Sequence, residues 1–273
     1  GEEPVTKRAR ILRIHMEEDA GKSVHGPGVS LVDLNRAGTP LIEIVSEPDL
    51  RSAAEAAQYL RDLRDVLMFA GVNDGNLEQG NFRCDANVSV RRRGDEKLGT
   101  RSELKNINSF RFVEEAIEVE VRRQIAEIEA GRPLRQATRG YNSENKTTYL
   151  LRDKEGDAGY RYFPEPDLLP LDLDDGFVAR VTSELPELPV ARRARYASAL
   201  GVTPYAAGVL TGHPAVAAFF DETLALGADA TKASNFIQTE VLKGADLHGV
   251  AARFSVTPAQ VARLLALVDA GTI

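Results

Sequence analysis

The stretch Phe82-Arg-Cys-Asp-Ala-Asn-Val-Ser-Val90 alternates between apolar and polar side chains. Every second residue from Phe82 is apolar, and the residues between are polar or charged. A period of two is typical of a β-strand with one buried face. The polar face carries Arg83 and Asp85, charges that a strand facing only water does not require. The stretch therefore predicts a half-buried strand whose polar face is a candidate for a functional site.

Other segments predict strands that accompany this one. Residues 10–17 alternate in the same way, although Ile11 breaks the pattern. Shorter candidates, bounded by Gly, Pro, Asn or Ser, are residues 30–34, 41–45 and 101–105. Together these segments indicate a largely antiparallel sheet.

Two long helices are predicted between the strands, and we interpret both as scaffold. The first begins at the N-cap Ser52, carries a stripe of leucines and ends at Gly71. The second runs from about Ser109 to Ala130, with an apolar residue roughly every four positions. The predicted fold class is therefore α+β, a largely antiparallel sheet with flanking helices.

The composition and the predicted secondary structure of the sequence change after residue 183. From residue 184 onward a Pro-bearing stretch precedes an alanine-rich region with helical patterns and no convincing strand. The last helix is marked by Thr257 as N-cap and Pro258 at its first position. We expect a domain of residues 1–183 followed by a small all-α helical domain of residues 184–273.

Composition limits the class of protein. The 273 residues are 43% hydrophobic, with no apolar run near the roughly 20 residues that a membrane span needs. We therefore expect a cytoplasmic protein with no membrane association. The single cysteine, Cys84, excludes an internal disulfide and any multi-cysteine metal site. A formal net charge of −7 gives no global attraction to nucleic acid, so any RNA contact requires a local patch.

The segment Arg13-Ile-His-Met-Glu-Glu-Asp-Ala-Gly-Lys22 gathers a histidine, three carboxylates and a lysine. Phosphate chemistry needs hard oxygen ligands for magnesium and a cation for anionic oxygens. Gly21-Lys22-Ser23 resembles the end of a phosphate-binding loop, but that pattern requires glycine where Met16 stands. A solvated strand end with an ordinary turn is an equally good interpretation of this segment alone.

Two further polar faces lie on strands 82–90 and 101–105. Each could be a cross-strand salt-bridge network on an exposed sheet, which is the commoner case. Three polar faces that could share one sheet surface favour a site instead. The side chains concerned are Glu78, Arg83, Asp85 and Asn87, and Arg101, Glu103 and Lys105.

Other conspicuous residues have plainer interpretations. Tyr160–Leu168 is an aromatic, proline-stiffened stretch that either packs on a sheet edge or forms a rigid loop beside the site. Cys84 is expected in the core, and the basic cluster of residues 191–195 is expected to be a solvated face rather than an RNA contact. Three histidines without partners at ligand spacing are interpreted as structural or surface residues: His25, His213 and His248.

Long motifs carry a family resemblance over nearly the whole chain in collinear order. They resemble the B subunit of the tRNA-dependent amidotransferases. The motifs are His15-Met-Glu-Glu-Asp-Ala-Gly-Lys22, Leu31-Val-Asp-Leu-Asn-Arg-Ala-Gly-Thr-Pro-Leu-Ile-Glu-Ile-Val-Ser-Glu-Pro-Asp49, Arg83-Cys-Asp-Ala-Asn-Val-Ser-Val-Arg91, Glu103-Leu-Lys-Asn-Ile-Asn-Ser-Phe-Arg-Phe112 and Tyr160-Arg-Tyr-Phe-Pro-Glu-Pro-Asp167.

The resemblance implies a cradle-like catalytic domain, ATP and Mg²⁺ as cofactors, and a mischarged tRNA as substrate. The γ-phosphoryl group of ATP would activate the side-chain carboxylate of Glu-tRNA(Gln) or Asp-tRNA(Asn), and ammonia would displace phosphate. The ammonia would come from glutamine hydrolysed by an amidase partner, the A subunit, and a small C subunit would complete a heterotrimer. The sequence leaves open which tRNA is used.

The resemblance also implies roles for individual residues. Metal binding is expected of Glu17 and Glu18, with His15 or Asp85 nearby. Catalytic roles are expected of Arg83, Lys105 and Glu103, and nucleotide contacts of Lys22 and Arg83.

Members of this family normally carry an upstream strand with a Glu and a His and a helical tail that grips tRNA. Neither is present in this sequence, so we expect a fragment that could be inactive in isolation. The alternative hypothesis is a non-catalytic RNA-binding or scaffold module of the same complex. A stand-alone ligase is disfavoured because the sequence has no glycine-rich phosphate loop.

Overall fold

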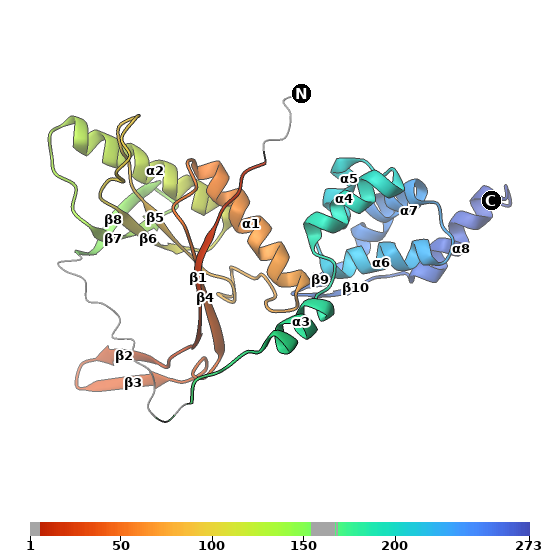
Figure 1. Cartoon of the computed structure of the whole chain (residues 1–273), viewed down its shortest axis with the longest axis horizontal. Helices are drawn as coiled ribbons and strands as arrows, with labels where there is room; N and C mark the ends of the chain where they lie inside the picture. Colours follow the sequence, from red (N-terminus) through yellow and green to blue (C-terminus); the bar gives the residue numbers. More distant parts are fainter. Residues whose placement is uncertain (1–5, 154–166, 168) are drawn as a thin grey trace. The chain divides into compact units, whose positions relative to one another are not determined.

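The structure, a computed structural model, describes residues 6–153, 167 and 169–273 (Figure 1). The chain divides into two compact units, Gly1–Tyr59 and Leu60–Ile273, and each is described by itself. Helix α1 (Ala53–Phe69) runs across the division. Its predicted N-cap is confirmed, since the Ser52 hydroxyl accepts a hydrogen bond from the Glu55 amide at 3.1 Å.

The first unit contains two antiparallel strand pairs. β1 (Ile11–Glu18) pairs with β4 (Pro40–Ser46), and β2 (Lys22–Gly26) pairs with β3 (Val29–Asp33). The alternation seen in residues 10–17 thus reports a real strand. Gly28, at φ 71°, occupies the tight turn between β2 and β3, where a side chain would be strained.

The second unit begins with a four-stranded sheet in the order β5-β6-β7-β8. Its strands are β5 (Cys84–Val88), β6 (Ser102–Ile107), β7 (Ala137–Asn142) and β8 (Thr147–Asp153). β6 and β7 are parallel and the other pairs are antiparallel. The parallel pair requires a long crossover, which helix α2 (Phe110–Glu129) supplies.

Helix α2 packs on one face of this sheet (Figure 1). Its apolar stripe, including Val113 and Ile117, is buried, and the hydroxyl of the N-cap Ser109 accepts from the Phe112 amide. The buried Gln124 donates to the Val88 carbonyl and accepts from the Val90 amide, which fixes β5 against the helix. The sheet's other face is left for the polar side chains of β5 and β6.

The remainder of the second unit is mostly helical. Its helices, in chain order, are α3 (Asp175–Glu184), α4 (Pro189–Leu200), α5 (Pro204–Leu210), α6 (Pro214–Ala225), α7 (Ala230–Phe236) and α8 (Pro258–Asp269). Between α7 and α8 lie a π-helical turn at Ile237–Val241 and a 3-10 turn at Leu242–Gly244. Tyr196 and Phe220 stack edge to face with ring centroids 4.9 Å apart inside the core of this region. A short hairpin, β9 (Asp246–His248) with β10 (Ala251–Arg253), adds strands that the sequence did not indicate.

The α+β prediction is confirmed, and the strands are largely antiparallel as expected. The proposed boundary between residues 183 and 184 stays a prediction. Along the described chain, no helix is both long enough and apolar enough to cross a lipid bilayer.

Candidate metal and phosphate site

Paired strands in the first unit bring together three potential metal ligands. His15 on β1 lies directly across from Glu43 on β4, and Glu17 follows two residues along the same face of β1. One donor atom from each of the three side chains lies within 4.8 Å of the other two. This group is produced by strand register, because a shift of one residue would move Glu43 to the opposite face.

The donor set of this group fits a divalent cation. Two carboxylates are the ligands that Mg²⁺ commonly takes from a protein, with water completing its shell, and an imidazole is more usual for transition metals. Arg13 Nη2 also lies 3.5 Å from Glu43 Oε1, but both side chains are almost half exposed and such a pair is weak. Glu43 therefore remains available as a ligand.

Two of the residues expected in this region are placed elsewhere. Glu18 lies opposite Pro40 and, as the next residue after Glu17, belongs to the other face of β1. Lys22 is the exposed first residue of β2 and lies across from Asp33. Neither belongs to the three-residue group, and their proposed metal and nucleotide roles stay predictions.

A second polar cluster lies on the sheet of the second unit. Lys105 on β6 forms ion pairs with Asp85 on β5 and, at 3.3 Å, with Glu103 Oε1 on its own strand. The other oxygen of Glu103 accepts from the Thr138 hydroxyl of β7 at 3.0 Å. Arg152 Nε of β8 reaches that hydroxyl at 3.4 Å. Four strands thus contribute to one polar face, which confirms that the polar faces of strands 82–90 and 101–105 meet. The polar face of residues 13–22 does not join them, because β1 and β2 belong to two separate two-stranded sheets, so the prediction of one surface shared by all three faces is wrong.

The charges in this cluster keep Lys105 protonated. Partial burial acts to lower the pKa of Lys105, but the hydrogen bond and charge of Asp85, reinforced by Glu103, outweigh burial and raise it. A lysine held in this way acts as a fixed positive charge rather than as a proton acceptor. It suits contact with an anionic oxygen.

Arg83 precedes β5 and is exposed. Its Nε donates to the Gly80 carbonyl at 2.9 Å, within the turn that also contains the exposed Glu78. The strand therefore begins later than the sequence pattern suggested, and Arg83 is carried by the turn instead of by the sheet.

The plainer interpretations agree with the structure. Cys84 is half-buried rather than fully in the core. Burial, with Asp85 adding to it, raises the pKa of its thiol to about 12, which does not suit a nucleophile. His213 caps α6 by accepting from the Ala215 amide, and its other ring nitrogen contacts the Gly249 carbonyl at 2.8 Å. His25 contacts the Ser30 hydroxyl, and His248 pairs with Asp246.

The arginines of the basic cluster of residues 191–195 form ion pairs with carboxylates. Arg195 Nη2 lies 2.7 Å from Glu187 Oε2, and Arg192 Nε lies 3.1 Å from the same oxygen. Arg193 Nη2 donates to Asp65 at 2.7 Å. These pairs favour a structural role over RNA contact. The stretch Tyr160–Leu168, apart from Asp167, lies outside the described residues.

Sequence reasoning missed Glu43 as a ligand. Its signal was present, since Glu43 is the one charged residue between Leu41 and Val45 in a segment already predicted as a strand. A carboxylate among apolar strand residues costs free energy unless it has a polar or charged partner, and His15 lies across from Glu43 as a candidate partner.

Known proteins match this chain over nearly its whole length. A family model described as the GatB/GatE catalytic domain matches residues 2–179. Three relatives, each named as the B subunit of an aspartyl/glutamyl-tRNA(Asn/Gln) amidotransferase, are similar to it. The protein of Anaeromyxobacter sp. (strain K) is 55% identical over 273 residues, that of Ralstonia pickettii (strain 12J) 52% over 280, and that of Streptococcus pneumoniae (strain CGSP14) 47% over 274.

These alignments cover 97%, 100% and 100% of this chain but only 56%, 57% and 57% of the respective relatives. The chain thus spans little more than half the length of the curated relatives it matches. Because the family model alone covers well over half of the chain, and the strands that carry His15, Glu17, Glu43 and Lys105 all lie inside the match, the chain belongs to the GatB/GatE catalytic domain family.

Proposed function

We propose that this chain carries the metal- and phosphate-handling part of an ATP-dependent amidotransferase that converts Glu-tRNA(Gln), Asp-tRNA(Asn) or both into the amide. The observation that carries the proposal is the convergence of His15, Glu17 and Glu43 across β1 and β4. The relatives' names support the class of substrate. We further propose that the chain works in a cytoplasmic complex with an amidase, the A subunit, and a small C subunit.

The chemistry requires a carboxylate to become an acyl electrophile. An oxygen of the side-chain carboxylate attacks the γ-phosphorus of ATP, the bond to the β,γ-bridging oxygen breaks, and an acyl phosphate and ADP result. Ammonia then attacks the carbonyl carbon, and the carbon–oxygen bond breaks with release of inorganic phosphate and a proton. Both steps place negative charge on phosphate oxygens, which fixed cations stabilise.

The residues of this chain divide that work. Glu17 and Glu43, with His15 beside them, would hold Mg²⁺, which when bound neutralises phosphate charge. Lys105, kept protonated by Asp85 and Glu103, supplies a fixed cation for a phosphate or carboxylate oxygen. Arg83, exposed on its turn, provides a planar guanidinium suited to a second such contact.

The test is Mg²⁺-dependent ATP hydrolysis by the complex assembled with the amidase and the small partner, stimulated by Glu-tRNA(Gln). Glu43→Gln should abolish the stimulation, because one of two carboxylate ligands is lost. Glu18→Gln removes the carboxylate on the opposite strand face, and the stimulation should survive in it if the metal is held on the face of Glu17. The matched control is Glu118→Gln, an exposed carboxylate of α2, which should retain the stimulation. Absence of any tRNA-stimulated hydrolysis in the wild-type complex would favour the non-catalytic scaffold alternative.

A further inference from the structure

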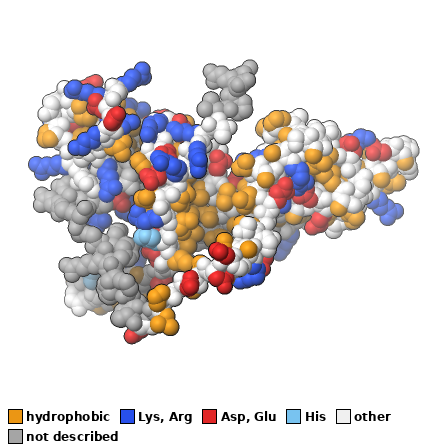
Figure 2. Space-filling view, in the orientation of Figure 1, with side chains coloured by type: hydrophobic (Ala, Val, Ile, Leu, Met, Phe, Trp, Pro, Cys, Tyr) orange, Lys and Arg blue, Asp and Glu red, His pale blue; other side chains and the backbone are white. Residues whose placement is uncertain are grey.

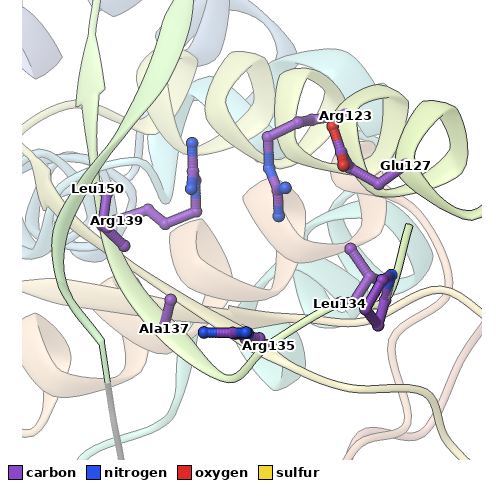
Figure 3. A pocket seen from close by; sticks show the side chains of 8 residues that line it. Arg123, Glu127, Leu134, Arg135, Ala137, Arg139 and Leu150 are labelled. Carbon is purple, nitrogen blue, oxygen red and sulfur yellow. The ribbon is translucent and has the colours of Figure 1, made fainter.

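A cavity of about 170 Å³ lies in the second unit between the C-terminal half of α2 and strands β7 and β8 (Figure 3). Since a water molecule occupies about 30 Å³ in the liquid, the cavity has room for a tetrahedral oxyanion with some water. Three arginines, Arg123, Arg135 and Arg139, contribute to its lining, together with Leu134 and Leu150. In Figure 3 the side chains of Arg123 and Arg139 extend into the space that the labelled residues surround.

Two of these arginines are held in place by a buried carboxylate. Glu120 is fully buried and accepts from Arg123 Nε at 2.9 Å and from Arg123 Nη2 at 2.6 Å. Arg139 Nε lies 3.3 Å from the same carboxylate and donates to the Thr148 hydroxyl at 3.0 Å. Within the described residues, the Nη1 atoms of Arg123 and Arg139 have no hydrogen-bond partner. Each guanidinium group is therefore held in a fixed orientation, and its Nη1 atom can still donate a hydrogen bond to a ligand.

Positive charge exceeds negative charge around the cavity. Among the described residues, Glu127 is the one carboxylate in the cavity lining, and Arg132 already binds it through two hydrogen bonds, of 2.5 Å and 3.0 Å. Arg135 is exposed and has no ion-pair partner among the described residues. Burial and then the neighbouring charge of Arg123 lower the pKa of Arg139, a sign that its surroundings undercompensate its charge. Figure 2 shows Lys and Arg side chains gathered over this part of the unit.

The cavity is separate from the Lys105 cluster. Arg139 projects to the α2 face of the sheet, where it meets Glu120. Its neighbour Thr138 projects to the other face, where it bonds Glu103. Alternation along β7 therefore places the arginine cavity and the Lys105 cluster on opposite faces of one sheet.

We propose that this cavity binds a phosphate group, contacted by the guanidinium groups of Arg123, Arg135 and Arg139. Arg123 and Arg139 can each donate through Nη1, and the exposed Arg135 can offer its whole guanidinium. The oxygens of a tetrahedral phosphate point in several directions and can accept from all three, and guanidinium groups bind phosphate through charge-assisted hydrogen bonds. The phosphate comes either from the backbone of an RNA strand or from free inorganic phosphate. The inference is independent of the proposed catalytic function, because no residue of the cavity belongs to either polar cluster described above.

The first experiment is calorimetric titration of the 273-residue chain with inorganic phosphate in a phosphate-free buffer. Saturable binding is expected, and Arg135→Gln should weaken it about tenfold because a charge-assisted contact is lost. Arg135 is exposed, so this variant should fold normally. The matched control is Arg122→Gln on α2, which removes the same charge next to Arg123 but outside the cavity lining, and it should leave the affinity within about twofold.

The second arm measures the fluorescence anisotropy of a labelled single-stranded RNA at several salt concentrations. If the phosphate belongs to RNA, Arg135→Gln lowers the RNA affinity and reduces the salt slope by about one, whereas Arg122→Gln does not. A loss confined to inorganic phosphate identifies free phosphate as the ligand. If neither arm distinguishes Arg135→Gln from Arg122→Gln, or wild-type chain shows no saturable binding of either probe, the proposal is overturned.

Discussion

His15 and Glu43 face each other across the antiparallel pair of β1 and β4, and Glu17 lies on the same strand face as His15. Two carboxylates this close repel each other in the absence of a cation. A divalent ion would relieve that repulsion. It would also cross-link β1 and β4, which pair only with each other in a two-stranded sheet. Metal binding and local stability should therefore be linked in the first unit.

Mg²⁺ is expected to stabilise the chain against thermal unfolding. A ligand that binds only the folded state at 100 times its dissociation constant adds about 2.7 kcal/mol to the free energy of unfolding. The measurement is the melting temperature by circular dichroism with Mg²⁺ and with EDTA. Glu17→Gln should remove the difference between the two conditions. An unchanged difference in that variant would place the cation elsewhere.

Lys105 should make the stability of the second unit depend on pH at the alkaline end. Because its pKa is raised above the ordinary value of 10.5, its contribution is fully present below that pH and is lost as pH rises through the folded-state pKa. Urea unfolding of wild type and Lys105→Gln should therefore give a difference in free energy that is constant near neutral pH and shrinks above about pH 10.5. A difference that grows with alkaline pH would contradict the assignment.

Glu120 should be the most costly carboxylate of α2 to neutralise. It is fully buried, binds Arg123 and also accepts from Gln124 and Thr148. Glu120→Gln should lower the free energy of unfolding by about 3–5 kcal/mol, because charged guanidinium groups lose their buried partner. Glu118→Gln, in an exposed pair with Arg122 on the same helix, should cost less than about 0.5 kcal/mol in the same urea titration.

Thr257 should contribute measurably to the helical region. Its hydroxyl accepts from the Gln260 amide at 3.2 Å, and the Gln260 side chain accepts from the Thr257 amide at 2.8 Å, which completes a capping box on α8. Thr257→Ala should therefore destabilise the chain by about 1 kcal/mol in chemical denaturation. Thr272→Ala, beyond the end of the same helix, serves as the control and should have almost no effect.

Local patterns predicted much of the fold. The alternation of residues 10–17, the N-caps at Ser52 and Thr257 and the helix start near Ser109 are short-range signals, and each corresponds to an observed strand or helix start. Strands β7 and β8 were not predicted. The sequence of β7 does not alternate simply between apolar and polar residues, since it contains Arg139 and Gly140. Arg139 lies on the face toward α2, where it pairs with Glu120 and also donates to Thr148 of β8.

The sites were harder to predict than the strands. Glu17 and Glu18 look equivalent in sequence, but only strand pairing shows that Glu17 and Glu43 share a face. The arginine cavity draws residues from α2, β7 and β8, so its members are far apart along the chain and no motif contains them. Long-range register, which decides both groups, is absent from any local pattern.

The most direct measurement of the central claim is a Mn²⁺ titration of the 273-residue chain, with Mn²⁺ as a paramagnetic substitute for Mg²⁺ and free ion counted by electron paramagnetic resonance. One high-affinity site is expected in wild type and in Glu18→Gln. It should be lost or weakened at least about tenfold in Glu17→Gln and in Glu43→Gln, since each removes one of two carboxylate ligands. Equal weakening in Glu18→Gln, or an unchanged site in Glu43→Gln, would contradict the assignment of the metal to the face that β1 and β4 share.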